Sequence, residues 1–297
     1  MAEEIVGRLK PGTRLKDTYT IDSYIGAGAF GCVYKARHRF LGMQAVKVFH
    51  EKALPENGEN EFFNEAFILS KINHPNVVRV FEANVDKVDG ENLYYISMEL
   101  VHGSSIKQIL EDSIRLDIET ATRVAIDICW GLSAAHEMNP AVVHRDVIPS
   151  NVLVTKGESG VGAKVVDFGV SAFVNPLTRV TGAAGVLAYM PLEAFKGYEV
   201  PASDIFSVGM VLFQMLTGTV PYKLVGLDAT RTVEQARKVI VEAREAGPKK
   251  ASEYNSKISA KLDWIILKAL SPNLNQRFSS GREMAVELEG YLRSAFP

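Results

Sequence analysis

The pattern of polar and apolar residues changes about one third of the way along the chain. Residues 1–18 mix charges with Pro11-Gly12 and predict an extended lead-in. From Tyr19, polar and apolar residues alternate, with many β-branched and aromatic side chains, as is typical of strands. One helix is predicted over 61–72, ending at Asn73-His74-Pro75. The other predicted strands cover 32–36, 45–49, 77–83 and 93–100, with a polar turn over 86–92.

Helical periodicity dominates the rest of the chain. Ser104 or Ser105 and then Asp117 are candidate N-caps for the first two helices. The helix that starts at Ser203-Asp204 and ends before Gly218 is apolar on all sides, so we expect it in the centre of a lobe. The predicted helices cover 106–111, 117–137, 203–216, 232–246, 262–270 and 281–294, and two short strands cover 151–155 and 163–166.

Three glycines near the first strand, Gly26, Gly28 and Gly31, have the spacing G-x-G-x-x-G. This spacing opens a helix in dinucleotide-binding folds and covers phosphates as a hairpin loop in kinases. Here the run Cys32-Val33-Tyr34-Lys35-Ala36 follows, and its β-branched and aromatic residues favour the hairpin. Glycines let backbone N–H groups approach phosphate oxygens without obstruction by a Cβ. On its own, the motif is also compatible with a hairpin that binds nothing.

A second group of polar residues has the order acid, amide, acid that phosphoryl transfer needs. The stretch Val143-His144-Arg145-Asp146-Val147-Ile148-Pro149-Ser150-Asn151 places Asp146 ahead of Asn151, and Asp167-Phe168-Gly169 follows. One carboxylate can orient the attacking hydroxyl, while the amide and the second carboxylate hold Mg²⁺ on the phosphates. We therefore expect the rest of the chain to bring a nucleotide to these residues.

Composition and charge exclude several other classes of protein. The chain of 297 residues is 47% hydrophobic, enough for a full core. Its net charge of −2 implies neither nucleic-acid binding nor attraction to an anionic membrane. Cys32 and Cys129 are too few for a disulfide framework or a zinc site, and the N-terminus lacks a signal-peptide pattern, so a cytoplasmic, reducing compartment is expected. The apolar stretches are too short to span a membrane.

Taken in this order, the motifs resemble those of protein kinases of the eukaryotic type, and they are closest to the bacterial serine/threonine kinases. The resemblance covers about residues 19–294, and seven or more motifs in the family's order make it specific. It implies an α+β, bilobal protein kinase fold with a lead-in over 1–18, a small β-rich N-lobe with one key helix over 19–101, and a larger, mainly helical C-lobe over 102–297. It also implies ATP and Mg²⁺ as cofactors and protein Ser/Thr hydroxyls as substrates. The sequence does not indicate which protein is the substrate or what the oligomeric state is.

The resemblance assigns roles to the candidate site residues. Asp146 corresponds to the catalytic base, and Asn151 and Asp167 correspond to the Mg²⁺ ligands. Met98 corresponds to the gatekeeper at the start of the hinge. The residues expected around the nucleotide are Ile25, Gly26, Gly28, Gly31, Val33, Ala45, Lys47, Met98, Glu99, Val101 and Leu153.

Lys47 corresponds to the lysine that holds the α- and β-phosphates, and it needs a carboxylate to fix it. Glu65 is the expected partner, because it lies near the inner face of the predicted helix. Glu61 is its rival, although an acid is favoured at a helix start in any case.

Further correspondences concern the loops of the C-lobe. Asp204 matches the aspartate that anchors the catalytic loop, and Glu193 and Arg277 match a buried ion pair. Arg145 can pair with a phosphate, which indicates control by phosphorylation of the loop over 170–193. The candidate phosphorylation sites are Ser171, Thr178 and Thr181.

The chain departs from the family's pattern at three positions. Ile148 replaces the lysine that neutralises charge on the transferred phosphate, and Val186 replaces the threonine that bridges this lysine and the catalytic aspartate. Because exchanging both polar partners leaves no group unsatisfied, the two replacements are interpreted as one change. Loss of one charge-stabilising contact costs about 10²–10³ in rate, so a slow kinase is expected. The third departure, Pro191-Leu192-Glu193 in place of Ala-Pro-Glu, is expected to alter only the substrate shelf.

Three functions are therefore compared. The first is an ATP- and Mg²⁺-dependent serine/threonine kinase. The second is an ATP-binding pseudokinase that acts as a scaffold or allosteric partner, motivated by Ile148 and Val186. Retention of the base, the metal ligands and the phosphate loop favours the kinase. The third, a phosphotransferase for small molecules, is disfavoured by Arg145, by Asp167-Phe168-Gly169 and by the long loop that ends in Glu193.

Overall fold

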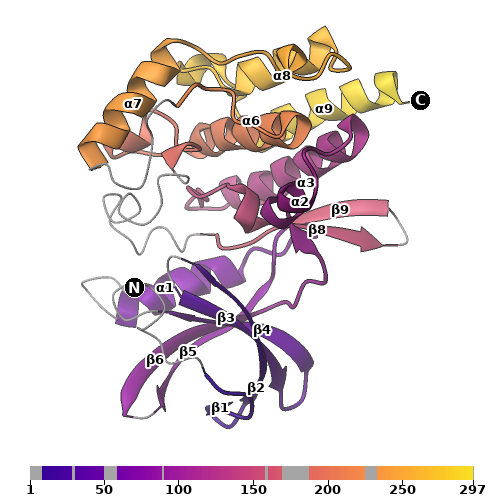
Figure 1. Ribbon diagram of the computed structural model, residues 1–297. Coiled ribbons are helices and arrows are strands. Elements are labelled where there is room, and N and C mark those ends of the chain that lie inside the picture. The colour runs from indigo at the N-terminus through magenta and orange to yellow at the C-terminus, as the bar shows by residue number, and fades with distance from the viewer. Residues whose placement is uncertain are drawn as a thin grey trace. The chain divides into compact units, whose positions relative to one another are not determined.

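The computed structural model describes residues 9–28, 31–49, 59–88, 90–157, 160–168, 187–224 and 233–296. Its chain divides into two compact units. The first unit runs to Asn73 and resumes over Val78–His102. The second takes His74–Val77 and the described residues from Gly103 on. Figure 1 shows the elements of both units.

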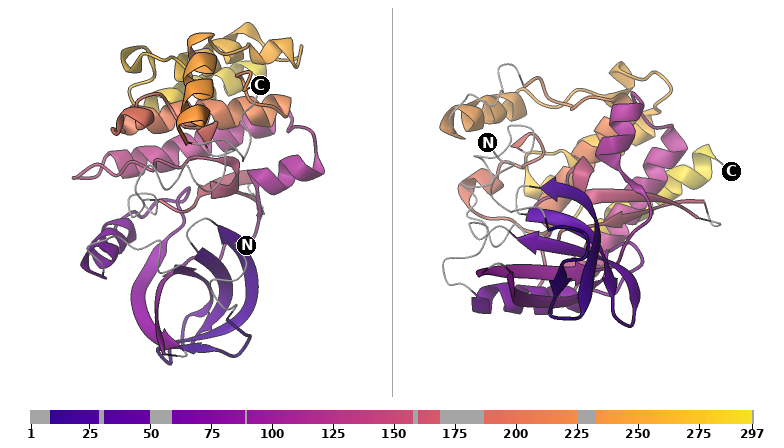
Figure 2. Two further views of the ribbon diagram at one scale, coloured as in Figure 1. Left: turned by 60° about the vertical axis from the view of Figure 1, so that its left-hand side comes forward. Right: turned by 60° about the horizontal axis from the view of Figure 1, so that its bottom comes forward.

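The first unit is built on a curved antiparallel sheet with one helix. The sheet has the order β1-β2-β3-β4-β6-β5, and its curvature is visible in Figure 2. Helix α1 (Glu59–Ser70) packs on it through Phe62, whose ring centroid lies 5.3 Å from that of Phe49 and 5.5 Å from that of Tyr94. The strands are β1 (Arg14–Leu15), β2 (Tyr19–Gly28), β3 (Gly31–His38), β4 (Gly42–Phe49), β5 (Val80–Val88) and β6 (Glu91–Met98).

Alternate residues of these strands face one hydrophobic core. Because side chains alternate between the two faces of a strand, Tyr34 and Val46, which are paired across β3 and β4, lie on the same face. Val48 and Tyr95 are paired in the same way across β4 and β6. The buried cluster on this face comprises Leu9, Leu15, Tyr19, Ile21, Cys32, Tyr34, Ala36, Val46, Val48 and Tyr95.

In the described part of the predicted lead-in, only Arg14–Leu15 form a strand, with turns over 11–12 and 16–18, so the extended conformation is confirmed only in part. Leu9 and Leu15 of this stretch belong to the core cluster. Strand β1 pairs with β2, placing Leu15 opposite Tyr19. The backbone N–H of Leu9 donates to the Tyr34 hydroxyl at 3.1 Å. Because charged residues surround Leu9 and Leu15, the sequence pattern did not predict that these two residues are part of the core.

The second unit is mainly helical and is organised around helix α6 (Pro201–Thr217). Residues 203–213 of α6 are all buried, and the helix contacts α3, α8 and α9, as predicted for an element apolar on all sides. A small antiparallel sheet of β7 (Ser104–Ser105), β8 (Val152–Gly157) and β9 (Gly160–Val165) completes the unit. The other helices are α2 (Ile106–Asp112), α3 (Ile118–His136), α7 (Val233–Glu245), α8 (Ala260–Ala269) and α9 (Gly281–Ala295).

The predicted helix caps are mostly confirmed. Ser105 caps α2, and Asp117 caps α3 by accepting the N–H of Thr120 at 2.8 Å. Gly218 ends α6 with a left-handed φ of 77°. The predicted start of α6 at Ser203-Asp204 was wrong, because the helix begins at Pro201, whose fixed φ suits a first turn.

The strand prediction over 77–83 was displaced. The observed β5 runs from Val80 to Val88 and pairs with β6 from Val88↔Glu91 onward, so the polar turn predicted over 86–92 is largely strand. Strand β5 is the edge of the sheet and its side chains are mostly half-exposed, so polar residues are tolerated there.

Candidate functional site

The glycine-rich stretch of the first unit forms a hairpin, as predicted. Strands β2 and β3 pair as far as Gly28↔Gly31, with Gly26 opposite Val33. No helix follows the motif, which excludes the dinucleotide-binding alternative for this stretch.

The three glycines are required for different reasons. A Cβ at Gly31 would lie 1.9 Å from the backbone oxygen of Val48, so the packing of β3 against β4 excludes any side chain there. A Cβ at Gly26 or Gly28 would meet nothing within 4 Å among the residues that the structure describes. Protein packing therefore does not account for these two glycines, whereas a ligand that approaches the backbone would.

One face of the sheet collects the residues predicted to surround the nucleotide. Lys47 lies opposite Val33 on β3 and opposite Ile96 on β6. Ala45, two residues before Lys47 and therefore on the same face, lies opposite Met98. This is the face opposite to the core cluster that contains Tyr34. Lys47 and Ala45 are buried, with 3% and 6% of their surface exposed.

Glu65 lies on helix α1, which packs against β4, the strand that carries Lys47. Phe62 of α1 contacts Phe49 of β4, which is on the same sheet face as Lys47. Glu65 follows Phe62 by just under one helical turn and is half-buried. The ion pair between Lys47 and Glu65 stays a prediction. The side chain of its rival, Glu61, lies outside the described residues.

The residues predicted as a hinge follow the last sheet strand. The backbone N–H of Glu99 donates to the carbonyl oxygen of Arg79 at 2.9 Å. Val101 is half-buried at the end of the first unit. Ile25 lies at a register shift between β2 and β3 and is 52% exposed. Leu153 belongs to the second unit, where it pairs with Ser105 and Lys164 in the small sheet.

In the second unit, buried Asp204 holds the catalytic loop, as the resemblance implied. Its Oδ2 accepts the backbone N–H of His144 at 2.8 Å, and its Oδ1 accepts that of Arg145 at 2.8 Å. His136 Nε2 lies 2.7 Å from the same Oδ2. Burial acts to raise the pKa of the Asp204 carboxyl, but the hydrogen bonds from the His136 ring and from the His144 backbone outweigh it and lower that pKa. The loop therefore rests on an ionised, well-hydrogen-bonded carboxylate.

His144 connects the catalytic loop to the residue before Asp167. Its Nε2 donates to the carbonyl oxygen of Val166 at 2.9 Å, and its Nδ1 accepts the backbone N–H of Asp146 at 3.2 Å. Because a carbonyl oxygen can only accept, the proton of the neutral ring is on Nε2. The ring also packs on Phe168 at a centroid distance of 4.4 Å. One buried imidazole thus ties together the two backbone segments that carry the candidate acids.

Asp146 and Asn151 are in direct contact, and Asp167 directly follows a residue that is hydrogen-bonded to Asn151. The amide nitrogen of Asn151 donates to the Asp146 backbone oxygen at 2.9 Å and to Asp146 Oδ2 at 2.8 Å. The N–H of Val166 donates to the backbone oxygen of Asn151 at 3.0 Å, immediately before Asp167. The backbone N–H of Asp146 is held by His144, and Asp167 has a left-handed φ of 62°.

This donor set fits Mg²⁺. Because the Asn151 nitrogen is engaged by Asp146, its amide oxygen remains as the ligand atom, and Asp167 adds a carboxylate. Mg²⁺ prefers such oxygen ligands and is held by few protein groups together with phosphates and water. The described residues contain no cluster of three or more His, Cys, Asp or Glu that suits another metal.

Ile148 lies half-buried in the catalytic loop, where its carbonyl oxygen accepts the N–H of Asn151 at 2.9 Å. Arg145 has the one long cationic side chain in the sequence 143–151. Its Nε lies 3.9 Å from Glu199 Oε2. Arg145 therefore already faces a carboxylate. Val186 and the candidate phosphorylation sites Ser171, Thr178 and Thr181 lie outside the described residues.

The predicted buried ion pair is confirmed. Arg277 donates from Nη1 to Glu193 Oε1 at 2.6 Å and from Nη2 to Oε2 at 3.0 Å. The Ser203 hydroxyl donates to Glu193 Oε1 at 2.8 Å. This paired, hydrogen-bonded carboxylate fixes the chain just after the 187–190 segment.

Two contributors were missed by sequence reasoning. His136 lies on α3 and contacts Asp204, although a lone histidine near a helix end gave no signal of this role. Arg244 lies on α7, a helix in which the sequence showed no chemistry, yet it is buried with 3% exposure. Its position on the apolar side of an otherwise polar helix was the signal that could have identified it.

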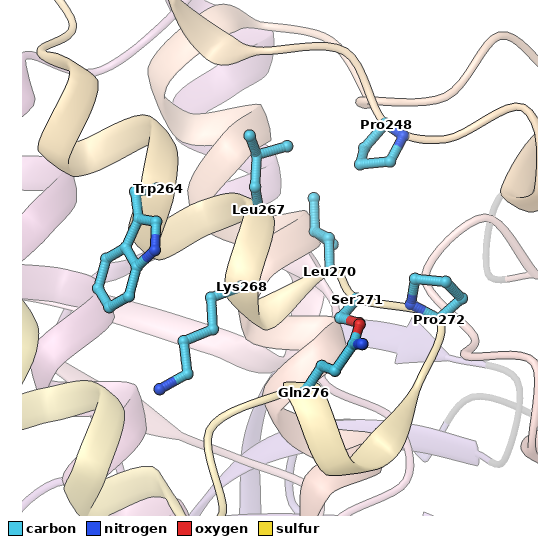
Figure 3. Close-up of a pocket in the computed structure, with 8 residues that line it drawn as sticks. All are labelled: Pro248, Trp264, Leu267, Lys268, Leu270, Ser271, Pro272 and Gln276. Atoms are coloured by element: carbon cyan, nitrogen blue, oxygen red, sulfur yellow. The ribbon is translucent and has the colours of Figure 1, made fainter.

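A surface pocket of the second unit contains none of the predicted site residues. Figure 3 shows Trp264 and Lys268 at one side of it and Pro248, Pro272 and Gln276 at the other. The Lys268 Nζ is engaged by Glu283 at 2.8 Å. This pocket offers no base or metal ligand for phosphoryl transfer.

Comparison with known proteins places these observations in one family. The model of the protein kinase domain matches residues 19–288. A probable serine/threonine-protein kinase of Streptomyces coelicolor is 31% identical over 286 residues, covering 94% of this chain and 40% of that protein. One from Clostridium acetobutylicum is 32% identical over 282 residues, covering 93% and 40%. The chain thus spans about two fifths of the length of these relatives.

Solved structures agree on the fold. The crystal structure of the Mycobacterium tuberculosis PknI kinase domain is similar with a TM-score of 0.71 at 24% identity, over 95% of this chain and 99% of that one. Among the residues the structure describes, no helix is both long and apolar enough to cross a membrane. Because the family model matches most of the chain, the chain belongs to the protein kinase family. It has the kinase fold of a β-sheet N-lobe and a helical C-lobe.

Proposed function

We propose that the chain is a serine/threonine protein kinase that transfers the γ-phosphoryl group of ATP to hydroxyl groups of proteins. The observation that carries this proposal is the frame of His144 and Asp204, which holds Asp146 against Asn151 and ties the segment before Asp167 to them. A chain without phosphoryl transfer has no physical need for a base and two metal ligands held in this way.

The roles follow from the chemistry of each group. Asp146 orients the substrate hydroxyl and accepts its proton. Members of the family use ATP and Mg²⁺, and Asn151 and Asp167 are the residues that would hold the ion. Mg²⁺, when bound, neutralises charge on the phosphate oxygens. From the first unit, the hairpin glycines Gly26 and Gly28 admit the phosphates to the backbone.

The remaining assignments on the first unit complete the nucleotide site. Lys47, fixed by Glu65, holds the α- and β-phosphates. Val33 and Ala45 cover the adenine, and Met98 and Glu99 belong to the hinge that contacts it.

The free, buried thiols of Cys32 and Cys129 suit a reducing, intracellular compartment.

Ile148 favours a slow enzyme, and together with Val186 it is the reason to consider a pseudokinase scaffold as the alternative. The missing lysine removes a charge-stabilising contact, which costs about 10²–10³ in rate but leaves the base and metal ligands in place. The scaffold would bind ATP without turnover.

Intact-mass spectrometry of the purified chain incubated with Mg-ATP, beside an Asp146→Asn variant, tests the proposal. We expect a mass gain in multiples of a phosphate that is absent from the variant. Because some kinases do not modify themselves, casein is included as an added substrate. Absence of phosphate on both the chain and casein, with ATP still bound, would favour the scaffold.

A further inference from the structure

Arg244 of α7 is a buried cation without an anionic partner among the described residues. Only 3% of its surface is exposed. Its guanidinium carbon lies 3.8 Å from the ring centroid of Tyr222 and 4.8 Å from that of Phe206. Its Nε and Nη1 atoms are buried and have no hydrogen-bond partner among the residues described. Burial lowers the pKa of this guanidinium to about 10, which still leaves it charged at neutral pH.

Such a group is costly, since a buried polar atom without a partner costs about 1–3 kcal/mol. The like charge of nearby Arg277 adds to the cost, since it also lowers the pKa of Arg244. Glu193 does not offset the charge of Arg244, because both of its carboxylate oxygens accept from Arg277. Groups that break local rules of stability are expected at functional positions. The question is which atoms Arg244 serves.

The guanidinium of Arg244 donates hydrogen bonds to the 187–190 segment. Its Nη2 donates to the carbonyl oxygen of Ala188 at 2.5 Å and to that of Met190 at 3.4 Å. The carbonyl oxygen between them, that of Tyr189, accepts the Ser207 hydroxyl at 3.1 Å. Three consecutive carbonyl groups are therefore held by side chains and not by secondary structure.

Apolar packing joins the same segment to α7. Leu187 and Met190 lie in one buried cluster with Ala236 and Ile240 of that helix. The Tyr189 hydroxyl donates to Gln214 of α6. The conformation of the segment thus depends on two helices, and Arg244 is the charged link to one of them.

We propose that Arg244 is a positioning residue for the protein substrate, which fixes the 187–190 segment so that a peptide can bind along it. The inference rests on the proposed kinase function, in which this segment, directly ahead of Glu193, forms the substrate shelf. Arg244 touches no reacting group, so it acts on the affinity for protein and not on the chemical step.

Steady-state phosphorylation of casein by Arg244→Ala, Arg244→Lys and Arg237→Ala tests this role. Arg237 is the matched control, because it is an exposed arginine on the same helix. We expect Arg244→Ala to raise the KM for casein by about tenfold or more, as loss of charge-assisted hydrogen bonds implies, with kcat and the KM for ATP within about twofold of wild type. Arg244→Lys keeps the charge but not the planar fork, and falls in between.

An unchanged KM for casein in a folded Arg244→Ala protein would overturn the inference. So would a joint rise in the KM values for casein and ATP in Arg244→Lys, which indicates general destabilisation. If wild type transfers no phosphate at all, the proposed function fails and the role toward a protein substrate fails with it. Hydrogen–deuterium exchange then tests separately the structural part of the inference, that Arg244 fixes the 187–190 segment. Amides of 187–190 are expected to exchange at least about tenfold faster in Arg244→Lys than in Arg237→Ala, and equal rates would overturn it.

Discussion

Ile148 carries no charge at a position of the catalytic loop where the family's pattern has a lysine. Its neighbours Asp146 and Asn151 are nevertheless in contact, so the loop is formed without the lysine. We predict that Ile148→Lys combined with Val186→Thr raises the rate of phosphoryl transfer, by up to about 10²–10³, because the cation returns to the developing charge. Initial rates with casein measure this.

Ile148→Met is the matched control, because it keeps the apolar character and nearly the volume. Its rate is expected to equal that of wild type. A flat or lower rate in the double variant would mean that another group already supplies the charge.

Asp204 illustrates at the residue scale what a motif leaves open. The sequence indicated that an aspartate at the start of a central helix anchors the catalytic loop. The structure adds the two backbone N–H groups and His136 that make an ionised carboxylate stable in a buried place. These partners lie far from Asp204 in the sequence, so no local pattern could identify them.

At the scale of elements, the β2–β3 hairpin separates glycines needed for folding from glycines available to a ligand. We predict that Gly31→Ala lowers the free energy of unfolding by about 1–3 kcal/mol, because its Cβ would overlap the Val48 carbonyl oxygen. Gly26→Ala meets no atom of the described residues within 4 Å and is expected to keep full stability while weakening ATP binding. Thermal unfolding and titration with a fluorescent ATP analogue measure the two effects.

The pair of variants also tests the assignment of the hairpin. If Gly26→Ala binds ATP as tightly as wild type, the phosphates do not approach this backbone. If Gly31→Ala is as stable as wild type, β3 and β4 are not packed as the structure has them.

The position of α7 shows the limit of periodicity. The sequence pattern predicted a helix over 232–246, and Val233–Glu245 is helical, with bounds close to that range. Periodicity identified the helix, but it could not tell that the 187–190 segment lies beneath Arg244. Arg244 and its hydrogen-bond partner Ala188 are 56 residues apart in the sequence.

At the scale of the molecule, the second unit depends on charges paired inside its core. We predict that Glu193→Gln lowers the free energy of unfolding by about 3–5 kcal/mol, because it leaves Arg277 buried without a countercharge. Glu287→Gln is the matched control: it breaks a pair with Lys261 that is as short, at 2.6 Å, but exposed. Its expected cost is about 0–1 kcal/mol. Urea unfolding of both variants measures the difference.

Similar losses in the two variants would contradict this view, because burial would then not distinguish the pairs. A loss in Glu193→Gln that is small while Arg277→Met is severe would mean that the hydrogen bonds of Arg277 to Ser271 and Ala202 carry the effect.

The sequence by itself determined most of the elements, with β5 displaced, and the identity of the candidate catalytic residues. Alternation placed the strands, and apolar content placed α6 at the centre of its unit, because these patterns depend only on which face of an element is buried. The order of Asp146, Asn151 and Asp167 indicated phosphoryl transfer, because the reaction requires those chemical groups. The roles of these residues, and the ion pair of Lys47 with Glu65, stay predictions.

Only the tertiary structure decided which groups hold one another in place. The clamp of His144 on Val166, the anchoring of His136 and Asp204, and the grip of Arg244 on Ala188 each join residues distant in sequence. A hydrogen bond depends on the positions of both partners to within a few tenths of an ångström. That precision arises from the packing of whole helices and strands, which no local pattern of residues contains.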